Sequence, residues 1–76
     1  MFEPMSPFAA QRWIDAIFTS QAAQQGKVVR RKLSDIERYA GYDVFKGEIA
    51  RRGYTAVRNG DTIVIFCNRE PIHRIV

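Results

Sequence analysis

The sequence predicts a small α+β domain, and three features of the 76-residue chain support this class. Residues 7–25 carry apolar side chains at the spacing of an amphipathic helix, and residues 34–52 contain start and stop signals for two short helices. Residues 54–67 contain two apolar runs on either side of Asn59 and Gly60, a strong hairpin signal. We therefore expect an N-terminal helix, a short strand, two short helices, an antiparallel hairpin and a C-terminal strand.

The length and composition place limits on the class of protein. A chain of 76 residues holds one hydrophobic core, so we expect a single domain with residues 1–5 as a flexible tail. An apolar content of 46% argues against disorder. Cys67 has no second cysteine to pair with, which fits a reducing compartment, and no apolar run reaches membrane-spanning length. We expect a cytoplasmic protein with no membrane role.

The N-terminal helix has clear boundaries. Ser6 is suited to cap a helix, and Pro7 lacks the N–H that the first turn leaves unpaired. Gly26 is expected to end the helix. One face of this helix should belong to the core, and its apolar residues are Ala10, Trp13, Ile14, Ile17 and Phe18.

A short strand and two helices should follow. The β-branched pair Val28 and Val29 predicts a strand over residues 27–32. Ser34 and Glu37 have the spacing of a capping box, which starts a helix that ends at Gly41. Asp43 is expected to cap a second helix that runs to Arg52 and stops at Gly53. Two short helices joined by a few residues that include glycine are typical of a helix-turn-helix.

The last third of the chain predicts an antiparallel sheet. Asn59 and Gly60 predict a type I′ turn between strands over residues 54–58 and 62–67. Because the second strand is apolar at residues 63–67, it should be central in its sheet or covered on both faces. A turn over residues 68–71 then leads to a strand over residues 72–76, from Ile72 to Val76.

The charge distribution indicates a binding surface. Residues 27–59 contain nine basic and four acidic residues, an excess of five positive charges. Such an excess attracts phosphate backbones without reading sequence, although a solvated basic surface has the same composition. Together with the order of elements, which is similar to that of winged helix-turn-helix domains, it predicts a small regulatory protein that binds duplex DNA.

The helix over residues 43–52 is the expected recognition helix. At about 100° per residue, Phe45 and Ile49 should face the core, with small and basic residues opposite them. Glu48 opposes DNA binding, but Arg52 follows it by four residues and is placed to neutralise it. The predicted nucleic-acid-binding residues, including the wing and the first strand, are Arg30, Arg31, Lys32, Lys46, Gly47, Ala50, Arg51, Arg58 and Asn59.

The residues that catalysis or metal binding requires do not converge. If residues 68–71 form a tight turn, Cys67 and His73 point to opposite faces of the sheet and cannot act as a nucleophile and its base. No spacing of Cys, His and carboxylates resembles a metal site, and the glycines form no phosphate-binding loop. We expect neither an enzyme nor a bound cofactor.

The segment VVRRKLSDIERYAG…F…EIARRGYTAV…NGDTIVIFCN…PIHRIV resembles a group of short bacterial proteins, some of which are labelled phosphoribosylanthranilate isomerase. That enzyme is a (β/α)₈ barrel of typically about 250 residues, which this chain cannot form. We therefore treat that label as an error. The resemblance covers most of the chain from Val28 and implies no residue-level function.

A second class of function fits the same sequence. The apolar C-terminal strand would leave an open edge over residues 72–76, which is able to pair with a protein partner or a second copy. The chain would then be a protein-binding adaptor or a small homodimer with no nucleic-acid role. DNA binding requires Lys46, Arg51 and Arg58 on one face, whereas strand pairing requires that edge to be open.

Overall fold

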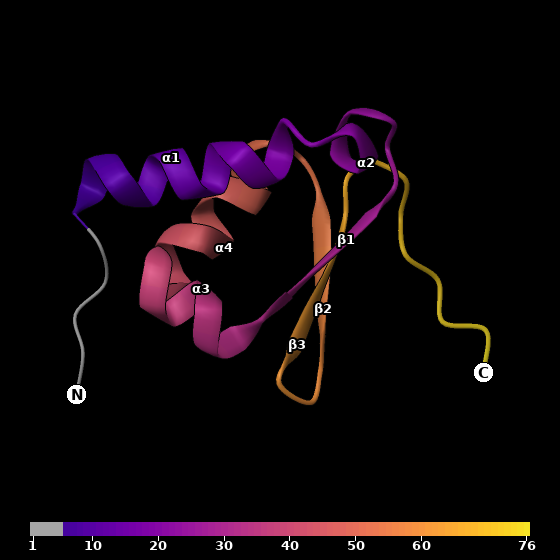
Figure 1. Cartoon of the computed structure of the whole chain (residues 1–76). Helices are drawn as coiled ribbons and strands as arrows, with labels where there is room; N and C mark the ends of the chain where they lie inside the picture. The colour runs from indigo at the N-terminus through magenta and orange to yellow at the C-terminus, as the bar shows by residue number, and fades with distance from the viewer. Residues whose placement is uncertain (1–5) are drawn as a thin grey trace.

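A computed structural model describes residues 6–76 and confirms the α+β class and the expected order of helices, strand and hairpin. The expectation of a flexible tail concerns residues 1–5, which lie outside the described part. Figure 1 shows α1, α3 and α4 on one side of the sheet, α2 at one end near the start of β1, and the C-terminal segment leaving on the other side. The elements are α1 (Pro7–Phe18), α2 (Gln21–Gln24), β1 (Val28–Lys32), α3 (Leu33–Tyr39), α4 (Tyr42–Arg51), β2 (Thr55–Asn59) and β3 (Thr62–Phe66).

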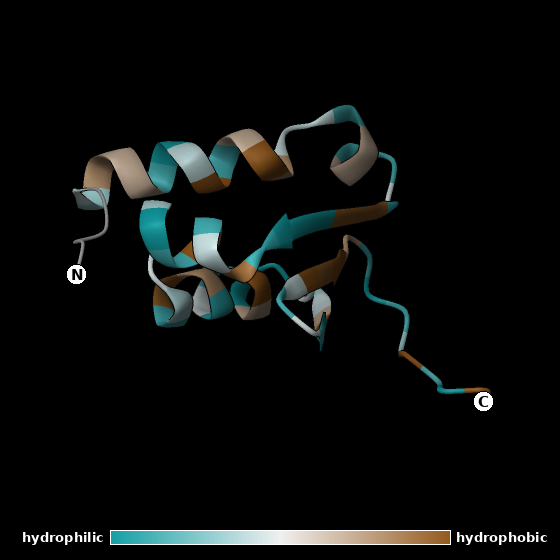
Figure 2. Cartoon of the chain, turned by 60° about the horizontal axis from the view of Figure 1, so that its bottom comes forward, coloured by the Kyte–Doolittle hydropathy of each residue, from teal (hydrophilic) through white to brown (hydrophobic). Residues whose placement is uncertain are grey.

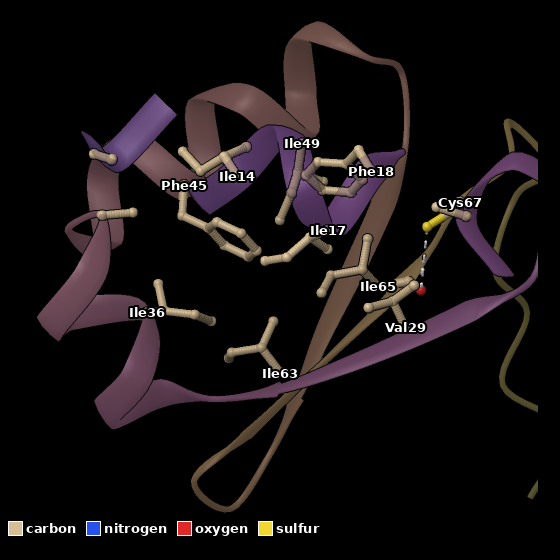
Figure 3. Close-up of a cluster of buried hydrophobic side chains, with 13 residues drawn as sticks. Ile14, Ile17, Phe18, Val29, Ile36, Phe45, Ile49, Ile63, Ile65 and Cys67 are labelled. Atoms are coloured by element: carbon tan, nitrogen blue, oxygen red, sulfur yellow. Dashed lines mark hydrogen bonds between the residues drawn. The ribbon is translucent and has the colours of Figure 1, made fainter. Parts of the chain in front are cut away.

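The three strands form an antiparallel sheet in the order β1-β3-β2. The apolar strand β3 is central, as its composition predicted. Val29 of β1 and Ala56 of β2 both pair with Ile65, so these three residues share the face that the helices cover. Figure 3 shows Ile63, Ile65 and Val29 pointing from this face toward the helical side chains. Ile65 is fully buried and pairs with residues of both neighbouring strands, so the centre of the sheet is anchored in the core through β3.

The N-terminal helix is shorter than the expected 7–25. Ser6 caps α1, because its hydroxyl oxygen accepts a hydrogen bond from the Ala9 N–H at 3.3 Å. The helix ends after Phe18, where the Thr19 hydroxyl donates to the Asp15 carbonyl at 2.8 Å. Ser20 then adopts an extended backbone and caps the separate short helix α2. Ser and Thr side chains compete with backbone helix bonds in this way, which the apolar periodicity does not reveal.

Both predicted caps of the helix pair are wrong. α3 starts at Leu33, with Lys32 as its N-cap, so Ser34 lies inside the first turn and no capping box forms. α4 starts at Tyr42 after Gly41, whose φ of 90° favours glycine. α4 ends at Arg51, one residue before the predicted Arg52, which is its C-cap, and Gly53 follows with a φ of 76°. Acidic residues still lie in both first turns, where they complement the helix dipole.

The hairpin is confirmed, but its turn is shifted by one residue. Asn59 is the last residue of β2 and pairs with Thr62, so the two-residue loop is Gly60 and Asp61. Among residues 6–76 only glycines have a positive φ, and Gly60 has one of 64°. A type I′ turn needs positive φ at both loop residues, so that prediction is wrong. Glycine at the first loop position is instead the pattern of a type II′ turn.

The predicted C-terminal strand does not form. Residues 67–76 contain no strand, and Figure 2 shows them running away from the body of the domain. The reason is topological, because both neighbours of β3 are already occupied by β1 and β2. A fourth strand following β3 would have to reach an outer edge of the sheet. Ile75 and Val76 are instead 92% and 98% exposed.

Candidate nucleic-acid interface

Helix α4 has the two faces that its sequence predicted. Phe45 and Ile49 are buried in the core, where Phe45 points toward Ile17 of α1 (Figure 3). Its aromatic ring lies 5.9 Å from that of Trp13 and 6.1 Å from that of Phe18, measured between centroids. The opposite face of α4 is exposed and contains Lys46, Gly47, Ala50 and Arg51.

A groove of about 120 Å³ runs between α4 and β2, and both Lys46 and Arg58 line it. Arg58 pairs with Ile63 of β3, so strand alternation directs its side chain to the helix-covered side of the sheet. Lys46 reaches the same groove from α4, where its ammonium lies 5.2 Å from the centroid of the Tyr42 ring. Two basic residues twelve positions apart in the chain therefore lie at one concave surface.

Arg58 is held in place by its own turn. Its Nε–H donates a hydrogen bond to the Gly60 carbonyl at 2.7 Å. This bond uses one of the five N–H donors of the guanidinium and leaves the terminal nitrogens for a ligand. The shape of the turn at Gly60 thus determines where this charge is presented.

Arg51 is less available than Lys46. Its guanidinium nitrogen lies 2.6 Å from a carboxylate oxygen of Glu48, and this hydrogen bond raises the pKa of Arg51 above its ordinary value. Arg52 approaches the same carboxylate oxygen at 3.5 Å, which confirms the predicted pairing of Glu48 with Arg52. Glu48 is therefore neutralised by two arginines, and the charge of Arg51 is partly offset.

Arg52 joins the end of α4 to α1. Its guanidinium lies 3.3 Å from the Asp15 carboxylate and 4.6 Å from the centroid of the Phe18 ring. These contacts tie the helix that carries Lys46 to the N-terminal helix. Arg52 therefore has a positioning role and does not belong to the exposed surface.

The basic residues of β1 do not join this groove. Arg30 and Lys32 pair with Val64 and Thr62, on the sheet face opposite the helices. Arg31 points to the helix side and is half-buried. Asn59 pairs with Thr62 and so also lies on the outer face. The nine predicted residues are thus divided between the α4–β2 surface and the outer face of the sheet, with Arg31 on neither.

One exposed residue of α4 was missing from the predicted site. Asp43 lies in the first turn of α4 and is exposed. At about 100° per residue it falls between Lys46 and Gly47 on the exposed face. The sequence interpretation gave Asp43 only a capping role, although the same angular count would have placed it here. An aspartate at this position is able to accept a hydrogen bond from a cytosine amino group.

The thiol and the imidazole of the described residues have different surroundings. Cys67 is buried, and this burial raises the pKa of its thiol, while His73 is exposed in the C-terminal segment. Within residues 6–76 no three His, Cys, Asp or Glu side chains are grouped closely enough to hold a metal ion. None of the helices in this range has the length and apolar character needed to cross a bilayer.

A scan against protein-family models, a search of curated proteins and a search of solved structures each found no match to this chain. The resemblance to short bacterial proteins therefore stays a prediction. The function is inferred from the geometry of the domain alone.

Proposed function

We propose that this domain binds duplex DNA through α4 and the β2–β3 hairpin. The observation that carries the proposal is the shared groove lined by Lys46 and Arg58. Helix-turn-helix proteins place one helix in the major groove and support it with contacts to the phosphate backbone. In this domain α4 is that helix, and the hairpin is the wing beside it.

The exposed face of α4 suits close approach to DNA. Gly47 and Ala50 add almost no bulk, and no atom lies within 4 Å of the position a Gly47 side chain would take. Lys46 and Arg58, which line one groove along the edge of that face, neutralise phosphates there, while Asp43 is placed to meet base edges. Arg51 contributes less, because Glu48 shares its charge.

Fluorescence anisotropy with a mixed-sequence DNA duplex across a salt series tests this proposal. The expected result is binding that weakens steeply with salt, because phosphate neutralisation releases counterions. The double variant Lys46→Ala with Arg58→Ala should bind weakly. The matched control is Arg12→Ala with Arg74→Ala, which removes the same charge from α1 and the C-terminal segment. Absence of binding at low salt, or equal loss in both variants, would contradict the proposal.

A second candidate is binding to a protein or to a second copy through residues 72–76. Its support is the exposure of Ile72, Ile75 and Val76, at 42%, 92% and 98% of their surfaces. Apolar side chains exposed in this way favour partner contacts. Sedimentation of the wild type against Ile75→Asp separates the two: a concentration-dependent dimer that the substitution abolishes would favour self-association.

We also propose a cytoplasmic location without a catalytic role. Cys67 is an isolated thiol buried beside β3, which fits a reducing compartment. Covalent catalysis by Cys67 would require a nearby base, and His73 is exposed whereas Cys67 is buried.

A further inference from the structure

The outer face of the sheet has an unusual division of chemistry between its three strands. Its nine side chains form three rows, each running from β1 across β3 to β2. The rows are Val28, Phe66 and Thr55, then Arg30, Val64 and Val57, then Lys32, Thr62 and Asn59. The β1 edge is therefore cationic over two rows, the centre is mainly apolar, and the β2 edge carries two of the three uncharged polar side chains.

This face is partly open. Helices α1, α3 and α4 lie on the opposite side of the sheet, and the C-terminal segment leaves on this side (Figure 1). Val28 and Val57 at the edges remain 36% and 40% exposed, while Phe66 and Val64 of the central strand are half-buried. An antiparallel sheet with one solvated face normally places polar residues there. Here four of the nine side chains are apolar, and none of the nine is acidic. The face is thus suited to a ligand that is both anionic and able to contact apolar surface.

We infer that the outer face of the sheet binds single-stranded nucleic acid, as a site separate from the α4–β2 groove. Arg30 and Lys32 lie two residues apart, about 6.8 Å along β1, and would contact successive phosphates. The bases would stack on the ring of Phe66 and pack against Val64, both on β3. Their edges would then reach Thr62 and Asn59, which supply hydroxyl and amide hydrogen-bonding groups.

The shape and charge of the face favour this ligand over two others. The outward side chains cover an area of about 10 Å by 14 Å that is three strands wide, whereas the major groove of duplex DNA admits a two-stranded β-ribbon. A second copy stacked on the same face would offer Arg30 and Lys32 no acidic side chain, since none of the nine outward side chains is acidic. A single strand instead presents phosphates along one side and unpaired bases along the other, which matches the division between β1 and β3.

The test is anisotropy with a fluorescein-labelled oligothymidylate of about 12 nucleotides, within the usual range of site sizes. The double variant Arg30→Ala with Lys32→Ala should lower the slope of log K against log salt by about 1.4, since each lost phosphate contact in single strands contributes about 0.7. Phe66→Leu keeps the apolar volume but removes the ring, and should weaken binding about fivefold, at the lower end of base stacking. Thermal unfolding of each variant checks that the fold is intact.

Two controls separate this site from the proposed duplex site. Relative to the charge-matched control Arg12→Ala with Arg74→Ala, the variant Lys46→Ala with Arg58→Ala should lower duplex affinity but not oligothymidylate affinity. The outer-face variant should show the reverse. Failure of duplex binding alone would therefore leave the outer-face site standing. Oligothymidylate binding that is insensitive to Arg30, Lys32 and Phe66 would overturn the inference. So would equal competition by polyglutamate, which would indicate an acidic peptide site.

Discussion

Two groups of basic residues in this chain are arranged in opposite ways. Four bases lie within residues 27–32, but strand alternation sends Arg30 and Lys32 to the outer face and Arg31 to the helix side. Lys46 and Arg58 are twelve positions apart and nevertheless line one groove. Density of charge along a sequence is therefore a poor guide to a charged surface when the segment is a strand. The fold decides which bases act together.

The largest expected effect comes from the strand that both groups depend on. Ile65 of β3 is fully buried and pairs with residues of both β1 and β2. Ile65→Ala should lower the free energy of unfolding by about 2–5 kcal/mol, because it removes methyl groups and leaves a cavity. Urea unfolding measures this, with Val44→Ala as the control, since Val44 is 53% exposed. Duplex binding by an unfolded Ile65→Ala protein would show that net charge alone is sufficient for DNA binding and that the folded surface is not required.

The turn at Gly60 should be the next most sensitive position, and it affects only one of the two groups. Gly60 has a φ of 64°, and no atom lies within 4 Å of an added Cβ, so Gly60→Ala meets backbone strain without a clash. The cost should be about 1–2 kcal/mol. Because Arg58 donates to the Gly60 carbonyl, duplex affinity should also fall. Thermal unfolding and anisotropy measure the two effects, and unchanged duplex affinity would remove the hairpin from the interface.

The same substitution at Gly47 should have the opposite effect on stability. Gly47 is a helical, exposed residue with open space around it, so Gly47→Ala should stabilise the fold by about 0.5–1 kcal/mol. The added methyl group would stand on the face of α4 that approaches DNA, and duplex affinity should fall. A stabilised variant with unchanged duplex affinity would move the interface away from this part of α4.

The smallest expected effect is a pH dependence at the end of β3. Burial raises the pKa of Cys67 above its ordinary value of 9.0, so the native state holds the thiol proton more tightly than the unfolded chain does. The resulting stabilisation is full below the unfolded pKa and is lost as pH rises through the folded pKa. The free energy of unfolding should therefore fall between pH 8 and pH 10 more in the wild type than in Cys67→Ala. Equal falls in both proteins would show that Cys67 is not the titrating group.

The sequence predicted the elements of the fold better than their ends. Apolar periodicity located the buried faces of α1 and α4, because burial of Ile14 or Phe45 depends on a pattern that is visible in one helix. The break after Phe18 depends on hydroxyl groups that bond to the backbone, and the start of α4 depends on Gly41. The missing C-terminal strand depends on β1 taking the remaining free side of β3, which is a contact between distant segments.

The candidate site was also predicted only in part, because some of its features depend on contacts between distant segments. The exposed face of α4 follows from angular spacing, and so Lys46, Gly47, Ala50 and Arg51 were identified as a group. Lys46 and Arg58 line one groove because of the register of β2 against β3. The turn was predicted one residue too early, so this register was not predicted. That shift leaves Asn59 on the opposite face of the sheet from Arg58.

The central claim is that duplex DNA binds at the α4–β2 groove, and a comparison of two charge-matched variants tests it most directly. Anisotropy across a salt series would compare Lys46→Ala with Arg58→Ala against Arg30→Ala with Lys32→Ala, using one DNA duplex. The groove variant should lower the slope of log K against log salt by about 1.8, because each lost phosphate contact contributes about 0.9. The outer-face variant should leave the slope close to that of the wild type. Equal slopes for the two variants would contradict the claim.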